Sequence, residues 1–229
     1  MIALSQRLEA ILQLLQPCQL LADIGTDHGY LPIAAVQRGV ALRAIAADLR
    51  EAPLIAAARN IRQARVGAQI TAVRGNGLAP LKDHTVDALV LAGMGGHLMT
   101  QLWDSAPPGV LATVQQLVVQ PNEDVHVVRA WAFNAGWHLR DERIVEERGR
   151  FFTICGFAPG VGSDPAYATG EWSFADLCQI GPLLLARKDT GALCCYEHEH
   201  RRYLALVNSG VTARAADAEF WRAVCAALR

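Results

Sequence analysis

The order of short β-rich runs and helical stretches is the feature that most constrains how this chain can fold. After an opening helix over about residues 4–15, five runs have the pattern of strands: QLLADI, RAIAAD, QITAVR, DALVLAG and QLVVQ. Helical stretches such as EAPLIAAARNIRQARV separate them. Parallel strands need a long crossover, usually a helix, so this alternation predicts a parallel sheet with helices on both faces.

Two further runs break the alternation. HLRDERIVEE and RFFTICGFA follow each other with only a turn at Gly149 between them. Because this leaves no room for a crossover helix, the two runs should pair antiparallel. The sequence therefore predicts an α/β, Rossmann-like sheet of parallel strands closed by an antiparallel hairpin.

The composition changes near residue 160. A connection rich in Gly, Pro, Ser and Asp leads into three helical stretches near 173–188, 191–209 and 212–228. Ser173 followed by Asp176 has the pattern of a helix start. One face of the middle stretch is formed by Leu193, Tyr196, His200, Tyr203 and Val207. We expect a catalytic domain over 1–159 and a small helical domain over 160–229, the latter containing an antiparallel helical hairpin.

Composition narrows the class of protein. The chain has 229 residues, is 52% hydrophobic and carries a net charge of −1. Its longest apolar runs are far shorter than the roughly 20 residues of a membrane helix, so we expect no membrane segment. The amphipathic start of the chain, which includes Glu9, does not resemble a signal peptide, which favours a cytoplasmic location. A near-neutral charge argues against indiscriminate coating of nucleic acid but allows a local basic patch.

Cysteine and histidine spacing does not indicate a metal site. The six cysteines include no paired CxxC spacing, so neither a zinc site nor a disulfide framework is expected. His198 and His200 lie two positions apart on a predicted helix and point to different sides, which favours a solvated face over a metal site. No pattern in the sequence indicates an oligomeric state.

The turn after the first strand concentrates acidic residues. In ADIGTDHGYLP, Asp23 closes the strand and Gly25 lets the backbone approach a ligand. A dinucleotide-binding turn has the pattern GxGxxG here, because glycines admit a pyrophosphate. Carboxylates repel a pyrophosphate but attract a cation such as the sulfonium and amino groups of S-adenosylmethionine. This turn therefore points to S-adenosylmethionine as the cofactor.

Three more strand ends fit the same cofactor. Asp48, next to Leu49, stands where an acid accepts hydrogen bonds from ribose hydroxyls, although a helix N-cap for 51–66 is an equal alternative. Asn76 and Gly77 form a turn that can face an adenine edge or can serve the backbone alone. At the fourth end, Ala92, Gly93 and Met94 allow a close approach to the ligand. Together with the hairpin, these ends are typical of a class I methyltransferase sheet.

The sequence also resembles a known family. SQRL, ADIGTDHGYLP, AGMGG, QPN, RAW and IGPLLL are together similar to the bacterial tRNA (adenine-N1)-methyltransferases that act on position 22. The resemblance runs from Ser5 to about Val207 and implies a Rossmann-like catalytic domain, a helical coiled-coil-like domain, S-adenosylmethionine as cofactor and tRNA as substrate. Asn76 departs from the Gly-Asp-Gly pattern typical of the family.

Methylation of adenine N1 needs no strong base, but the product is cationic. A carboxylate near the exocyclic amine stabilises that charge, and the resemblance also implies Asp27 for this role. The alternative for Asp27 is an N-cap of the helix that starts near Tyr30. Tyr30 itself is a candidate for stacking on a base or for the core. His28 is expected to be an ordinary turn histidine.

Four further residues are candidates for substrate contacts. Gln120 and Asn122 end the fifth strand beside Pro121, where they either reach the base or form a turn. Arg7 on the first helix is the first candidate for a phosphate contact, and Arg129 is the second. Two other functions are compatible with these patterns: methylation of a small molecule or protein, and a catalytically silent RNA-binding adaptor.

Overall fold

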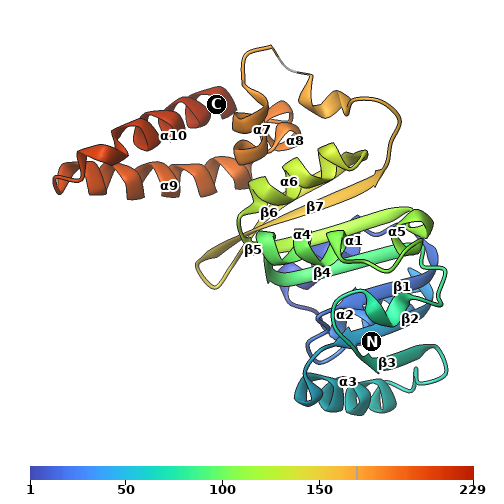
Figure 1. Cartoon of the computed structure of the whole chain (residues 1–229). Coiled ribbons are helices and arrows are strands. Elements are labelled where there is room, and N and C mark those ends of the chain that lie inside the picture. Colours follow the sequence, from blue (N-terminus) through green and yellow to red (C-terminus); the bar gives the residue numbers. More distant parts are fainter. Residues whose placement is uncertain (169) are drawn as a thin grey trace.

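A computed structural model describes residues 1–168 and 170–229 of the chain, so Thr169, in the connection that follows residue 160, lies outside the description (Figure 1). Its centre is one sheet of seven strands in the order β3-β2-β1-β4-β5-β7-β6. The strands are β1 (Cys18–Ile24), β2 (Ala41–Asp48), β3 (Ile70–Arg74), β4 (Ala88–Gly95), β5 (Gln116–Glu123), β6 (Trp137–Glu147) and β7 (Arg150–Pro159). The first five pair in parallel, while β7 pairs antiparallel with both β5 and β6. The predicted fold class is confirmed.

Helices cover both faces of the sheet. They are α1 (Gln6–Leu14), α2 (Tyr30–Gln37), α3 (Glu51–Gln63), α4 (Gly96–Asp104), α5 (Val110–Thr113) and α6 (Val125–Asn134), with a short 3₁₀ turn at Ala79–Leu81. Side chains from α1, α2 and α3 share one core with one face of the strands. Those from α4 and α6 share another core with the opposite face. Consecutive strand residues such as Leu117, Val118 and Val119 are therefore all buried.

The β6–β7 hairpin extends beyond the rest of the sheet. Strand β5 pairs with β7 only from Cys155 to Phe157, whereas β6 pairs with β7 along its whole length. The far end of the hairpin packs beside α1. Its turn consists of Arg148 and Gly149, which both have positive φ.

The C-terminal segment forms helices with a core of their own. They are α7 (Phe174–Ile180), α8 (Pro182–Ala186), α9 (Thr190–Asn208) and α10 (Ala215–Leu228), with 3₁₀ turns at Pro165–Tyr167 and Thr212–Arg214. Helices α9 and α10 lie side by side in the expected hairpin (Figure 1). Tyr196 is buried and the other residues of the predicted face are partly buried. Ser173 and Asp176 form a reciprocal capping box, as the helix-start pattern predicted.

The single helix expected over 173–188 is in fact two. Gly181, at φ 98°, separates α7 from α8, and Pro182 begins the second helix. A Cβ on Gly181 would lie 2.6 Å from Nη2 of Arg129 and 2.9 Å from Oε2 of Glu142. The chain therefore needs glycine here because the backbone passes directly against a buried ion pair.

That ion pair connects the sheet to the C-terminal helices. The Arg129 and Glu142 side chains are both fully buried, and the closest approach of their charged groups is 2.7 Å. Arg129 also donates to the carbonyl oxygen of Cys178 at 2.8 Å, and Glu142 accepts from the backbone N–H of Leu183 at 2.7 Å. Burial alone would lower the pKa of Arg129, but the Glu142 carboxylate holds it above its ordinary value.

The expectation that Arg129 contacts phosphate is therefore wrong, because its guanidinium is enclosed by protein groups.

Two other features concern the described residues as a whole. In residues 1–168 and 170–229, no helix is long and apolar enough to cross a membrane. In the same part of the chain, no three His, Cys, Asp or Glu side chains are grouped so that they could hold a metal ion.

Candidate functional site

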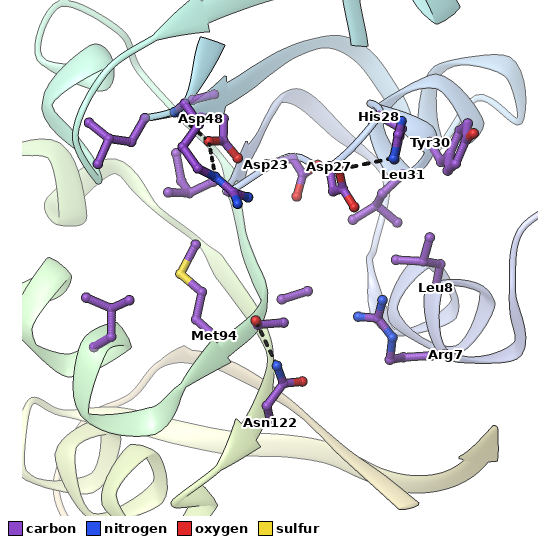
Figure 2. Close-up of a pocket in the computed structure, with 18 of the residues that line it drawn as sticks. Arg7, Leu8, Asp23, Asp27, His28, Tyr30, Leu31, Asp48, Met94 and Asn122 are labelled. Carbon is purple, nitrogen blue, oxygen red and sulfur yellow. Dashed lines mark hydrogen bonds and ion pairs between the residues drawn. The ribbon is translucent and has the colours of Figure 1, made fainter. Parts of the chain in front are cut away.

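A cleft of about 850 Å³ opens at the carboxyl ends of β1, β2 and β4, and the β6–β7 hairpin and α1 contribute to its walls. Figure 2 shows part of it, with Asp23 and Asp48 at one end and Asn122 at the other. The predicted site residues that line the cleft are Arg7, Asp23, Gly25, Asp27, Tyr30, Asp48, Leu49, Asn76, Gly77, Ala92, Gly93, Met94 and Asn122. Two predicted residues, Gln120 and Arg129, are absent from its lining.

Asp23 ends β1 and is almost completely buried. Burial raises the pKa of this carboxyl to about 6, and the nearby charge of Asp48 adds to the effect. A positively charged ligand in the cleft would favour ionised Asp23 and offset the burial. The site therefore suits a cationic group at this point.

Asp48 ends β2 and is also buried. Its Oδ1 accepts a hydrogen bond from the backbone N–H of Arg50 at 2.7 Å and lies 3.6 Å from the Arg50 guanidinium. Both contacts are to Oδ1, which leaves Oδ2 as an acceptor for a ligand. The N-cap of α3 is Arg50, so the alternative assignment of Asp48 as that cap is wrong.

Two glycine turns bring the backbone close to the ligand space. Gly25 has φ 76°, and a Cβ on it would lie 2.2 Å from Cε of Met94. Gly93 has φ 77° and faces open space. These turns let Met94 from β4 approach the end of β1, and Asn76 and Gly77 line the same cleft beyond β3. An adenosyl group fits this set of residues, since Asp48 offers a ribose acceptor and Met94 offers a polarisable apolar surface.

Asp27 differs from Asp23 although the same turn carries both. Its side chain is 70% exposed and lies 3.3 Å from Nε2 of His28. The N-cap of α2 is Gly29, with no side-chain cap, so the alternative assignment of Asp27 as an N-cap is wrong. Asp27 therefore carries a solvent-accessible carboxylate at the edge of the cleft.

The turn around Asp27 is fixed by its neighbours. His28 has φ 61°, and its carbonyl oxygen accepts a hydrogen bond from Nδ2 of Asn60 at 2.9 Å. The His28 and Tyr30 rings stack with centroids 5.4 Å apart and an interplanar angle of 17°. Tyr30 is 38% exposed, so it is not a core residue. The stacked pair offers a flat aromatic surface beside the Asp27 carboxylate.

A chain of hydrogen bonds orients the other side of the cleft. Nη1 of Arg7 donates to Oε1 of Gln120 at 2.6 Å, and Nε2 of Gln120 donates to Oδ1 of Asn122 at 3.2 Å. Nδ2 of Asn122 in turn donates to the carbonyl oxygen of Gly93 at 2.8 Å (Figure 2). Gln120 is fully buried, so the expectation of a direct contact with the base is corrected. Its side chain instead holds Arg7 and Asn122 in place.

Sequence reasoning missed the part of the cleft that the hairpin supplies. Arg148, Arg150 and Phe152 line the cleft, together with Leu8 of α1 and Leu31 of α2. The run GRFF at 149–152 was interpreted only as the start of a strand. The sequence signal that could have identified this part of the cleft is the pair of basic residues, Arg148 and Arg150, on either side of the turn glycine Gly149.

The parallel sheet with its antiparallel β7, and the acids at the ends of β1 and β2, define a class I methyltransferase. Comparisons with known proteins agree, because residues 4–155 match the methyltransferase domain family. A tRNA (adenine(22)-N(1))-methyltransferase of Bacillus subtilis is 32% identical over 186 residues, which are 81% of this chain and 76% of the relative. The chain belongs to the tRNA (adenine(22)-N(1))-methyltransferase family, which confirms the resemblance seen in the sequence.

Solved structures extend the similarity to nearly the whole chain. The crystal structure of the B. subtilis m1A22 tRNA methyltransferase TrmK has a TM-score of 0.84 at 26% identity, covering 98% of this chain and 100% of that one. A Streptococcus pneumoniae protein solved in complex with S-adenosyl-L-methionine has a TM-score of 0.85 at 28% identity, covering 97% of this chain and 100% of that one. The C-terminal helices are therefore part of the shared fold.

Proposed function

We propose that this protein transfers a methyl group from S-adenosylmethionine to N1 of adenine 22 in tRNA. The reaction is the one named for its B. subtilis relative, and S-adenosylmethionine is the ligand of the similar S. pneumoniae structure. The observation that carries the proposal is the division of one cleft into two parts. Buried acids at Asp23 and Asp48 suit the cofactor, and an exposed acid at Asp27 suits a second molecule.

The buried end of the cleft would hold the cofactor. Oδ2 of Asp48 accepts hydrogen bonds from the ribose hydroxyls, and Asp23 faces the cationic methionine portion. Gly25 and Gly93 allow the close approach, while Met94 packs against the adenosyl group. When bound, S-adenosylmethionine supplies an electrophilic methyl group.

The exposed end would hold the adenine. N1 of adenine carries its own lone pair at neutral pH, so no residue has to remove a proton before attack. Asp27 accepts a hydrogen bond from the exocyclic amine and stabilises the positive charge that develops on the ring. Tyr30, stacked on His28, supports the face of the base.

We assign part of tRNA recognition to Arg7 and to the helical segment over 160–229. A folded tRNA is large compared with the cleft, and recognition of structured RNA relies on backbone shape over a wide surface. Several of the segment's basic side chains are engaged in ion pairs: Arg187 with Asp141, Arg202 with Glu199 and Arg214 with Asp217. We therefore expect this segment to contribute shape and a few contacts rather than a strongly basic surface. The substrate also implies that the protein acts in the cytoplasm.

Incubation with labelled S-adenosylmethionine and bulk tRNA, followed by nucleoside analysis, tests the proposal. We expect label in 1-methyladenosine from tRNAs with adenine at position 22, and none from a transcript with guanine there. Label in protein or small molecules, with none in tRNA, would favour the alternative substrates. Binding of tRNA without any transfer would favour the silent adaptor.

A further inference from the structure

Three arginines surround the mouth of the cleft beside the candidate substrate site. Arg7 comes from α1, and Arg148 and Arg150 flank Gly149 at the end of the β6–β7 hairpin. The guanidinium carbon of Arg7 lies 5.5 Å from the centroid of the Phe152 ring, and that of Arg150 lies 5.3 Å from the same centroid. The half-buried Phe152 ring therefore contacts the guanidinium groups of both Arg7 and Arg150.

In the described part of the chain, no ion pair involves Arg7, Arg148 or Arg150. Glu147 also lines the cleft, and its Oε2 accepts from the backbone N–H of Arg7 at 3.0 Å. That hydrogen bond lowers the pKa of Glu147, and the nearby charges of Arg7 and Arg148 add to the effect. The Arg7 guanidinium instead contacts the neutral amide of Gln120. Three arginines and one glutamate therefore line this part of the cleft, and the excess positive charge attracts an anion.

The hairpin turn gives a second, independent observation. Arg148 has φ 54° and Gly149 has φ 74°, so both turn residues occupy the left-handed region between the paired Glu147 and Arg150. Asn, Asp or Gly is favoured at such a position, and a long side chain there strains the backbone. Arg148 thus occupies a strained turn position while its side chain lines the cleft.

The hairpin also lies between the cleft and the C-terminal helices. Phe152 faces Arg7, whereas the adjacent Phe151 contacts His198 of α9, with ring centroids 6.0 Å apart. Successive strand residues point to opposite faces, so β7 touches both regions. A nucleic acid that entered the cleft and lay along α9 would pass over this turn.

We propose that Arg7 and Arg150, which lie against Phe152, and Arg148 of the adjacent turn bind the RNA phosphates next to the target adenosine. This inference rests on the proposed function and identifies how the same site holds its substrate. Guanidinium groups match phosphate oxygens in planar, bidentate geometry, and stacking on Phe152 limits the freedom of two of them before RNA binds. The contacts would position the nucleotide without reading its base.

Arg148→Gly and Arg150→Ala test the proposal, with Arg140→Ala as the matched control. Arg140 is exposed on β6, outside the cleft. The affinity for tRNA is measured by filter binding over a range of salt concentrations, and S-adenosylmethionine affinity is measured by calorimetry. We expect each cleft variant to raise the tRNA dissociation constant about five- to tenfold. The slope of log Kd against log salt should flatten by about 0.7–0.9 for each phosphate that an arginine no longer neutralises.

Arg148→Gly separates function from structure. Glycine relieves the left-handed strain, so this variant should melt at the same or a higher temperature than the wild type while it binds tRNA more weakly. Cofactor affinity should stay unchanged, and Arg140→Ala should match the wild type in every assay. Wild-type tRNA affinity and salt dependence in both cleft variants would overturn the inference. If the wild type itself neither binds nor methylates tRNA, the proposed function fails, and the inference fails with it.

Discussion

Replacement of Glu142 by glutamine should destabilise the protein strongly although the side chain keeps its shape. Oε2 of Glu142 accepts from Nε of Arg129 at 3.0 Å and from Nη2 at 2.7 Å. Oε1 accepts from the backbone N–H groups of Leu183 at 2.7 Å and Leu184 at 3.2 Å. A glutamine amide has only one oxygen, so its NH₂ group would face donors in either orientation.

The burial of the pair sets the magnitude. Both side chains are 0% exposed, so the Arg129 charge would stay in the interior without a counter-ion. The removal of one partner of a buried ion pair costs about 3–5 kcal/mol. This is a large part of the roughly 5–15 kcal/mol that stabilises a typical protein. Because the Glu142 hydrogen bonds join β6 to α8, the C-terminal helices should unfold first.

Urea titration followed by circular dichroism and tryptophan fluorescence measures the change in the free energy of unfolding. Glu219→Gln is the matched control, since Glu219 pairs with Arg222 on the exposed surface of α10 and should unfold like the wild type. An Arg129→Met, Glu142→Leu double variant should not restore stability, because the carbonyl of Cys178 and the N–H of Leu183 would be left without partners. A Glu142→Gln protein whose stability lies within about 1 kcal/mol of the wild type would refute the reasoning.

Three further predictions concern the acids of the cleft. Asp48→Ala should weaken S-adenosylmethionine binding by about 1.5–3 kcal/mol in calorimetry, and unchanged affinity would remove Asp48 from the cofactor site. Asp27→Ala should leave cofactor affinity intact but slow single-turnover methylation about 100-fold or more, on the order of 3 kcal/mol. A parallel loss of cofactor binding would make Asp27 a cofactor ligand instead. For Asp23, burial raises the pKa in the folded, cofactor-free protein to about 6, above the ordinary value of 3.8. Between these two pH values the folded protein keeps a proton that the unfolded chain has lost. The free energy of unfolding therefore falls as pH rises from 3.8 to 6. Asp23→Asn should remove this pH dependence and increase the free energy of unfolding, measured with urea, by up to roughly 3 kcal/mol at pH 7. An unchanged pH profile would contradict the raised pKa of Asp23.

The strands and the major helices of the sheet were predictable because their patterns are local. Apolar runs of strand length and the short Gly149 turn determine pairing without reference to distant residues. The break at Gly181 was not predictable in the same way. Its glycine is required by contacts with Arg129 and Glu142, which lie far away in the sequence. A stretch with helical composition therefore split where tertiary packing demanded a close approach.

The grouping in one cleft of the residues proposed to hold the cofactor was predictable for a topological reason. Carboxyl ends of parallel strands meet at one edge of a sheet, so turn residues after β1, β2, β3 and β4 had to lie together. The hairpin residues Arg148, Arg150 and Phe152 follow no such rule. They reach the cleft because β6 and β7 extend past β5 and lie beside α1, and this overhang depends on strand register.

Arg129 shows the limit of assigning arginines from sequence. The stretch VHVVRAWAF surrounds it with apolar residues, and Val128, Arg129 and Ala132 of α6 are all buried. An arginine within an apolar face has to find a buried acid, because its charge is too costly to leave alone. The apolar surroundings of Arg129 in the sequence could have indicated a structural role. Only the folded structure shows that its partner is Glu142.

The two acids of the ADIGTDHGYLP turn lie in different environments because the backbone carries them to different places. Asp23 belongs to β1 and is 6% exposed, where burial raises its pKa to about 6. Beyond Gly25 the chain leaves the sheet, and the Asp27 side chain is 70% exposed. A buried carboxylate that gains its charge in the presence of a cation suits the cationic part of the cofactor proposed for this end of the cleft. An exposed carboxylate, held by His28 and next to Tyr30, suits a base that must enter and leave in each turnover.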